Sequence, residues 1–135
     1  LPLTQRFEQV IGIEGLPTLV KAAVENARIN NLTNVDFHVA DLTSADALTR
    51  ACGPKGPIDF LLLDPPRNGA AGVMPWIAKS GAKQILYISC HPATMIRDAE
   101  ILTKVGYQLS AVGVMGMFPH TTHIEAMALF EKSKN

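Results

Sequence analysis

The sequence predicts an α/β protein whose mostly parallel, doubly wound sheet is closed by an antiparallel strand. Short apolar runs alternate with segments of helical spacing along most of the chain, which is typical of parallel strands joined by crossover helices. The last two apolar runs follow each other with only a short connection, which predicts an antiparallel pair. At 135 residues the chain suits one domain, so we expect residues 1–135 to form a single domain.

The first part of the chain predicts two strands and two helices. Residues 9–14 are a short apolar run that ends in an acid followed by a glycine, as a buried strand does. Residues 16–31 carry apolar side chains at helical spacing and close with two asparagines. Residues 34–40 alternate like a strand, and the serine at the start of residues 44–50 can cap a short helix.

The second part predicts the centre and the closing edge of the sheet. Residues 58–63 are apolar without interruption, which predicts an interior parallel strand covered on both faces. Pro92 and Gly106 are well placed as the first residue and the stop of a helix. The remaining elements expected are a helix over residues 73–79, a strand over 84–89, a helix over 92–105, and strands over 107–117 and 124–130.

Composition and charge narrow the classes of function. Hydrophobic residues make up 47% of the chain and charged residues 18%, which excludes a disordered chain. The formal net charge is zero, so RNA binding must depend on a local patch or on sequence outside this chain. Cys52 and Cys90 follow no metal or disulfide spacing, and we see neither a signal peptide nor a bilayer-spanning run. We therefore expect a cytoplasmic protein with no membrane partner.

Polar side chains recur where the predicted strands end. Glu14, Asp41, Asp64 and Cys90 all lie at or just after a strand, and parallel sheets bind their ligands at this edge. Glu14 can accept hydrogen bonds from both hydroxyls of a ribose, or it can simply stabilise the start of a helix. Asp41 can hold an adenine amino group or cap the turn into the next helix. The sequence leaves both alternatives open.

The segment Asp64-Pro65-Pro66-Arg67 follows the most apolar strand. Its two prolines stiffen the loop, so a carboxylate and a guanidinium project from a fixed frame at the sheet edge. The pattern indicates methyl transfer to a flat base, whose polar edge the acid and the backbone would hold. The alternative is an ordinary turn that ends the strand.

Cys90 lies between a predicted strand and a predicted helix. The partial positive charge at a helix N-terminus stabilises a thiolate, so Cys90 is the candidate nucleophile. The alternative is a cysteine that only packs, and this is our interpretation of Cys52.

The connection between the last two strands contains further candidates. Glu125 is a carboxylate in an otherwise apolar strand, which suits a base that removes a proton, although a surface-facing glutamate is the alternative. Phe118 can stack on a base or pack in the core. His120 and His123 have no third ligand at metal spacing, so we expect no metal site.

Three of these segments resemble, in order and spacing, the signatures of the RNA (uracil-5-)-methyltransferase family. They are residues 64–69 (DPPRNG), 89–94 (SCHPAT) and 118–125 (FPHTTHIE). The resemblance extends over essentially the whole chain. The Cys-x-Pro-Ala-Thr variant at residues 90–94, together with Arg97-Asp98 and Gly106-Tyr107, looks most similar to the 23S ribosomal RNA branch, and the transfer-RNA branch is the alternative.

The resemblance implies a Rossmann-like class I fold and S-adenosylmethionine as cofactor. It implies that Cys90 adds to C6 of a uracil in RNA, which activates C5 to take the methyl group, and that Glu125 then removes the C5 proton. The positions of Glu14, Asp41 and Asp64 are similar to those that line the pocket for the cofactor and the target base.

For contacts with the RNA, the residues themselves offer Arg67 and Phe118 as candidates. Two positions depart from the family pattern. His91 stands where asparagine is usual, and Gly116 stands where an aspartate usually precedes the Met-Phe-Pro triplet, which bears on the support of loop 118–125. Neither departure removes the expected nucleophile or base.

Other features of the family have no counterpart in this sequence. They are the glycine-rich cofactor strand, the N-terminal RNA-binding domain and the cysteines that hold an iron–sulfur cluster. Because Leu1 stands where the glycine-rich segment should end, we expect a piece of a longer enzyme that lacks the first strand of its sheet. Two strand edges would then be unpaired, so we expect self-association, weak cofactor binding and no activity of this chain alone.

Three other classes of protein are rival hypotheses. The first is a binding module without catalytic activity. An amino-methyltransferase of the Asp-Pro-Pro type expects an aromatic residue where Arg67 stands, and a nicotinamide dehydrogenase expects a glycine fingerprint after a strand.

Overall fold

The computed structural model describes residues 1–52, 58–116 and 124–134. The chain divides into two compact units, the amino-terminal unit Leu1–Lys55 and the carboxyl-terminal unit Gly56–Asn135. In the described ranges, no helix has both the length and the apolar character needed to cross a membrane.

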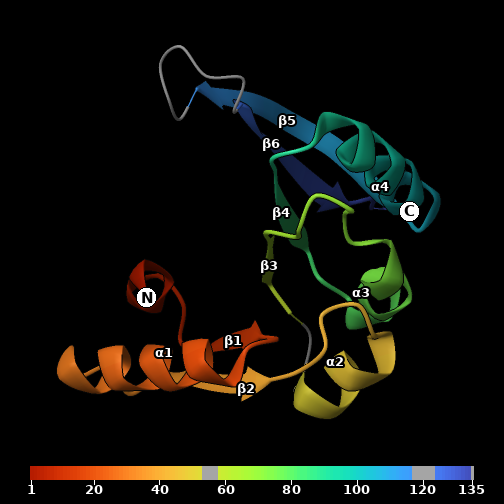
Figure 1. Cartoon of the computed structure of the whole chain (residues 1–135). Helices are drawn as coiled ribbons and strands as arrows, with labels where there is room; N and C mark the ends of the chain where they lie inside the picture. The colour runs from red at the N-terminus through yellow and green to blue at the C-terminus, as the bar shows by residue number, and fades with distance from the viewer. Residues whose placement is uncertain (53–57, 117–123, 135) are drawn as a thin grey trace. The chain divides into compact units, whose positions relative to one another are not determined.

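The amino-terminal unit is built on two parallel strands. β1 (Val10–Glu14) pairs in register with β2 (Val35–Val39), and α1 (Pro17–Ile29) is the crossover between them (Figure 1). α2 (Ala45–Cys52) follows, and the Ser44 hydroxyl accepts a hydrogen bond from the Ala47 amide at 3.2 Å, as expected of a cap. Cys52 is half-buried at the end of this helix.

The carboxyl-terminal unit contains a four-stranded mixed sheet. Its order is β3 (Phe60–Leu63), β4 (Gln84–Ser89), β6 (Ile124–Lys132) and β5 (Tyr107–Gly116). β3 and β4 run parallel, whereas β6 runs antiparallel to both β4 and β5 (Figure 1). The helical segments of this unit are η2 (Ala71–Val73), α3 (Met74–Ser80) and α4 (Pro92–Lys104).

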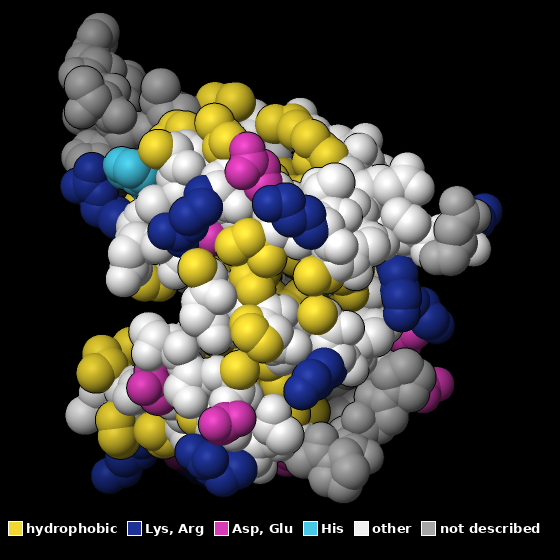
Figure 2. All heavy atoms as spheres, turned by 90° about the vertical axis from the view of Figure 1, so that its right-hand side faces the viewer, with side chains coloured by type: hydrophobic (Ala, Val, Ile, Leu, Met, Phe, Trp, Pro, Cys, Tyr) yellow, Lys and Arg dark blue, Asp and Glu magenta, His cyan; other side chains and the backbone are white. Residues whose placement is uncertain are grey.

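The core of this unit lies on one face of the sheet. Ile85, Tyr87 and Ser89 alternate along β4 and are buried. Their register partners on β6 are Phe130, Ala128 and Ala126, which are buried as well. Apolar side chains also reach the surface, and Figure 2 shows Lys and Arg side chains scattered between hydrophobic and acidic ones on one face.

The order and type of the predicted strands and of the main helices are confirmed, and four details differ. β3 begins at Phe60 rather than at residue 58 because its partner β4 begins only at Gln84. The prediction of an interior strand covered on both faces is wrong for β3: within the described residues it pairs with β4 alone, and Leu62 is 43% exposed. β6 extends to Lys132, which pairs with Tyr107.

The fourth difference is a short 3-10 helix, η1 (Pro2–Gln5), which no sequence pattern predicted. The Asn34 side-chain amide donates to the carbonyl oxygens of Thr4 at 2.8 Å and Phe7 at 2.9 Å. A residue about 30 positions further along the chain thus fixes this segment.

Candidate active site

The candidate residues of the carboxyl-terminal unit converge at one edge of its sheet. Asp64 follows β3 and Cys90 follows β4, and these strands are parallel with Leu63 opposite Tyr87. The pair Ser89–Ala126 ends the register between β4 and β6. Cys90 and Glu125 therefore lie one residue beyond that pair, on neighbouring chain segments. The pairing brings a thiol and two carboxylates to the same edge.

The backbone around Cys90 is fixed by a buried serine. The Ser89 hydroxyl donates to the His91 carbonyl oxygen at 2.9 Å and accepts from the His91 amide at 3.0 Å, and Ser89 is 4% exposed. Cys90 stands between the two residues and is exposed. α4 begins two residues later at Pro92, and no side-chain hydrogen bond caps it at His91. A thiol is thus presented to solvent just before the open N-terminus of a helix.

The loop that follows β3 lies against α4. The Thr94 hydroxyl lies 2.9 Å from the Arg67 carbonyl oxygen and 3.0 Å from that of His91. The side chains of Asp64 and Arg67 are exposed. The loop is therefore attached through its backbone while its charged side chains remain available to a ligand.

Glu125 is half-buried on β6 and lies opposite Met115 on β5. This setting is intermediate between the buried base and the surface glutamate that the sequence left open. Phe118, His120 and His123 lie outside the described residues. Among the residues that are described, no three metal-binding side chains gather at one place.

The amino-terminal unit holds the other two candidates at the carboxyl edge of its own sheet. Glu14 ends β1 opposite Val39, and Asp41 follows two residues after Val39. The Leu16 amide donates to Glu14 Oε1 at 3.1 Å. The hydroxyl and amide of Thr43 donate to Asp41 Oδ1 at 2.6 and 2.9 Å, and these hydrogen bonds hold the pKa of Asp41 below its ordinary value.

Both carboxylates thus make the local contacts of a helix start and a turn. The hydrogen bonds described for each use one oxygen, so each group has a second oxygen that can accept from a ribose hydroxyl or an amino group.

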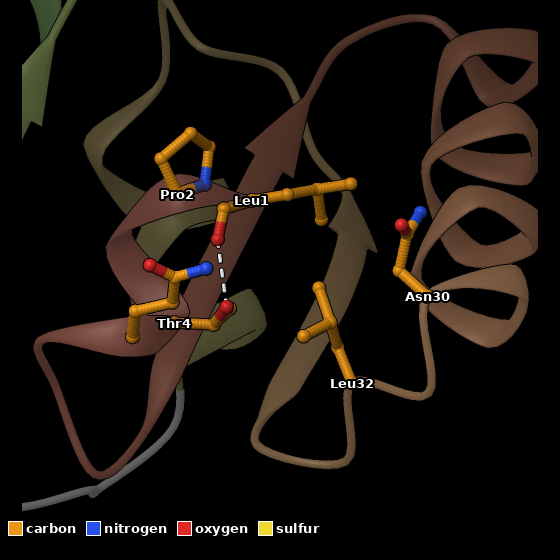
Figure 3. Close-up of a pocket in the computed structure, with 6 residues that line it drawn as sticks. Leu1, Pro2, Thr4, Asn30 and Leu32 are labelled. Atoms are coloured by element: carbon orange, nitrogen blue, oxygen red, sulfur yellow. Dashed lines mark hydrogen bonds between the residues drawn. The ribbon is translucent and has the colours of Figure 1, made fainter.

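The amino-terminal unit also has a hollow, which lies away from Glu14 and Asp41. Leu1, Pro2, Thr4, Gln5, Asn30 and Leu32 line it, and Figure 3 shows the Thr4 hydroxyl bonded to the Leu1 carbonyl oxygen beside it. Asn30 follows α1 and Leu32 precedes β2, so the hollow lies at the amino ends of the strands, opposite Glu14 and Asp41. It has no acidic or nucleophilic side chain suited to the predicted chemistry.

Similarity to known proteins was found over nearly the whole chain. A family model described as tRNA (uracil-5-)-methyltransferase matches residues 1–133. The 23S rRNA (uracil(1939)-C(5))-methyltransferase RlmD of Klebsiella pneumoniae is 46% identical over 132 residues, which are 98% of this chain and 30% of that protein. RlmD of Alkalilimnicola ehrlichii is 50% identical over 133 residues, which are 98% of this chain and 29% of that protein. The chain spans about 30% of the length of these relatives.

Solved structures show the same fold. The Pyrococcus abyssi tRNA (uracil-54, C5)-methyltransferase, in complex with S-adenosyl-L-homocysteine, matches with a TM-score of 0.78 at 28% identity. The match covers 95% of this chain and 30% of that one. Streptococcus pneumoniae Sp1610, in complex with S-adenosyl-L-methionine, matches with a TM-score of 0.74 at 13% identity, over 99% of this chain and 60% of that one. The fold is that of the class I methyltransferases.

Proposed function

The chain belongs to the tRNA (uracil-5-)-methyltransferase family, and from this premise we propose that it carries the catalytic residues of an enzyme that methylates C5 of a uridine in RNA. The observation that carries the proposal is the edge where Cys90, Glu125 and Asp64 come together. A nucleophile and a base on adjacent segments are what substitution at a poorly nucleophilic ring carbon requires.

Cys90 begins the reaction. Its thiolate adds to C6 of the uracil, and the electron pair of the C5–C6 double bond moves onto the ring carbonyl as an enolate. This makes C5 nucleophilic. S-Adenosylmethionine, when bound, would supply the methyl group, which C5 would take as the bond to the positively charged sulfur breaks and leaves a neutral thioether.

Glu125 completes the reaction. Its carboxylate takes the proton from C5, the electron pair re-forms the C5–C6 double bond, and the Cys90 thiolate leaves. The methyl group has replaced one proton, and the thiolate is regenerated. The half-buried position of Glu125 limits competition from water for its carboxylate.

The cofactor would be held by carboxylates at strand ends. Glu14 and Asp41 share the carboxyl edge of the β1–β2 sheet, which suits hydrogen bonds to the ribose hydroxyls and the adenine amino group. Asp64 and Arg67 are exposed on the loop after β3, where Asp64 would accept hydrogen bonds from the polar edge of the base and Arg67 would donate to the RNA. Each of these roles uses hydrogen-bonding groups that the described contacts leave accessible.

Ribosomal RNA is the preferred substrate class in this proposal. The RlmD relatives are 46% and 50% identical to the chain, whereas the Pyrococcus tRNA enzyme is 28% identical. A tRNA substrate is the alternative, and transcripts of the two RNA classes distinguish them by which one is methylated.

Trapping of the covalent intermediate tests the proposal. RNA with 5-fluorouridine has no C5 proton to lose, so wild-type enzyme with S-adenosylmethionine should accumulate a protein–RNA adduct that survives denaturing electrophoresis. In the complete gene product that contains this chain, Cys90→Ala should abolish both the adduct and methylation. Cys52→Ala is the matched control and should retain both. An adduct that persists in Cys90→Ala would remove this residue from the mechanism.

A further inference from the structure

We propose that Asp98 is a positioning residue of this active site. Its buried carboxylate holds loop 64–70 against the first turns of α4, and it thereby fixes where Asp64 and Arg67 stand relative to Cys90. The inference rests on the proposed function and adds to it a residue that touches neither the cofactor nor the RNA.

The Asp98 carboxylate is completely buried and fully engaged. Its Oδ2 accepts hydrogen bonds from the Ala70 amide at 2.7 Å and the Tyr87 hydroxyl at 2.5 Å. Its Oδ1 accepts from Arg97 Nε at 3.1 Å and Nη2 at 2.9 Å. One side chain thus joins the end of the loop, the centre of β4 and the guanidinium on its own helix.

The same helix holds the loop at two further points. Arg97 Nη2 donates to the Asn68 carbonyl oxygen at 2.8 Å, and the Thr94 hydroxyl lies 2.9 Å from that of Arg67. The attachment points are therefore residues 67, 68 and 70, and each is a backbone group. A shift of the loop would break all of them together.

Gly69 lets the loop approach this closely. Its φ is +82°, a conformation that side chains disfavour, and a Cβ there would lie 2.5 Å from Arg97 Nη2 and 2.6 Å from Asp98 Oδ2. The loop backbone packs directly on the ion pair, with no room for even one methyl group between them.

Stability alone does not account for a charge at this place. A buried carboxylate loses its hydration, and well-packed apolar side chains often stabilise a core as well as a buried ion pair does. The carboxylate adds directional hydrogen bonds that fix three segments relative to one another, because it accepts at once from a backbone amide of the loop and from groups on β4 and α4. Cys90 lies between β4 and α4, so the same network sets the loop relative to the nucleophile.

The test separates positioning from folding. In the complete gene product carrying Cys52→Ala, we would measure adduct formation with 5-fluorouridine RNA and the rate at which iodoacetamide alkylates Cys90. Asp98→Asn keeps the shape but loses the charge. It should slow adduct formation about 100-fold, the cost typical of a reacting group misplaced by 1 Å. Alkylation should be unchanged, because the small reagent needs no loop.

Two further variants keep the test decisive if Asp98→Asn does not fold. Tyr87→Phe removes one donor to Asp98 and should slow adduct formation less than Asp98→Asn does. Gly69→Ala adds a methyl group that pushes the loop away from the Arg97–Asp98 ion pair. It should slow adduct formation more than Tyr87→Phe does. Asp59→Asn is the matched control, since Asp59 forms an exposed ion pair with Lys83 at 2.7 Å. It should leave both rates at the wild-type value.

Two results would contradict the positioning role of Asp98, and a third would contradict the proposed function. Wild-type adduct rates in folded Asp98→Asn and Tyr87→Phe would overturn the positioning role. Equal losses of adduct formation and of alkylation would also overturn it, since Asp98 would then only support the fold around Cys90. A wild-type protein that alkylates normally but forms no adduct would instead contradict the proposed function itself.

Discussion

The two units of the chain differ in how firmly they hold their candidate residues. In the carboxyl-terminal unit lie the largest fully buried side chains described, which are Tyr87, Phe130, Ile77, Ile85, Leu102 and Asp98. In the amino-terminal unit the buried residues described are Thr4, Ala27, Ala40 and Leu48, and every residue of β1 is only half-buried. α1 in that unit also exposes large apolar side chains, among them Leu19 and Ile29.

This difference matches the tasks proposed for the two units. Covalent chemistry at C5 and C6 requires a nucleophile and a base held to within about half an ångström, which packed side chains and buried hydrogen bonds provide. Glu14 and Asp41 would bind hydroxyl and amino groups, and they are held by contacts with residues two positions away in the chain. Local turns are enough to hold the residues that bind the cofactor, whereas the reacting residues are held by a packed core.

The largest expected effect is that of Glu125→Gln on the reaction, compared with that of Glu14→Gln on cofactor binding. Glu125→Gln removes the base, so the methylated covalent intermediate should form normally and break down about 100-fold more slowly or worse. Rapid-quench analysis of enzyme–RNA intermediates in the complete gene product measures this directly. Glu14→Gln is the matched variant in the other unit and should weaken cofactor binding about tenfold without changing breakdown. Breakdown of the intermediate at the wild-type rate in Glu125→Gln would show that another group removes the proton.

Truncation of a buried side chain should destabilise the carboxyl-terminal unit more than the amino-terminal unit. Phe130 is 1% exposed on β6 of the carboxyl-terminal sheet, so Phe130→Ala should lower the free energy of unfolding by about 3–5 kcal/mol. Leu48 is 4% exposed in the thinner unit, and Leu48→Ala should cost about 2 kcal/mol because its surroundings can collapse more easily. Hydrogen exchange of each unit's strand amides reports the two values separately. Equal costs would contradict the difference in core thickness.

The smallest effect concerns pH. Burial, and then the hydrogen bond to Asp98, raise the pKa of Tyr87 above its ordinary value of 10.0, and burial also raises the pKa of Tyr107. Below about pH 10 both tyrosines are protonated in folded and unfolded chains alike. Above it the unfolded chain releases protons that the folded chain retains, so stability should fall by up to about 1.4 kcal/mol per pH unit for each group.

Denaturant titrations from pH 8 to 11 test this expectation. Tyr87→Phe should reduce the slope of stability against pH, because one of the two perturbed phenols is gone. Glu25→Gln is the control: Glu25 forms an exposed ion pair with Arg28, and the substitution should leave the slope unchanged. An identical slope in Tyr87→Phe would show that this phenol does not titrate differently in the two states.

Much of the fold and of the candidate site could be predicted from local patterns. The bounds of β4 are those expected, and α4 begins at Pro92 with Gly106 at φ +102° just after it. Cys90 and Asp64 could be placed at one edge because parallel strands must end on the same side of a sheet. Glu125 needed the register of β4 with β6, which only the structure supplied.

The sequence by itself determined the order of strands and helices and the family, and it supplied the candidate catalytic residues, because these depend on side-chain periodicity, on proline and glycine, and on short motifs. Only the tertiary structure decided which groups meet. In the sequence Asp98 is part of the family resemblance but has no visible partner, whereas in the structure it accepts hydrogen bonds from Tyr87, 11 positions away, and from Ala70, 28 positions away. Likewise Asn34 fixes η1 from 30 residues away. Such contacts arise from how packed elements cross, and no local pattern along the chain encodes that geometry.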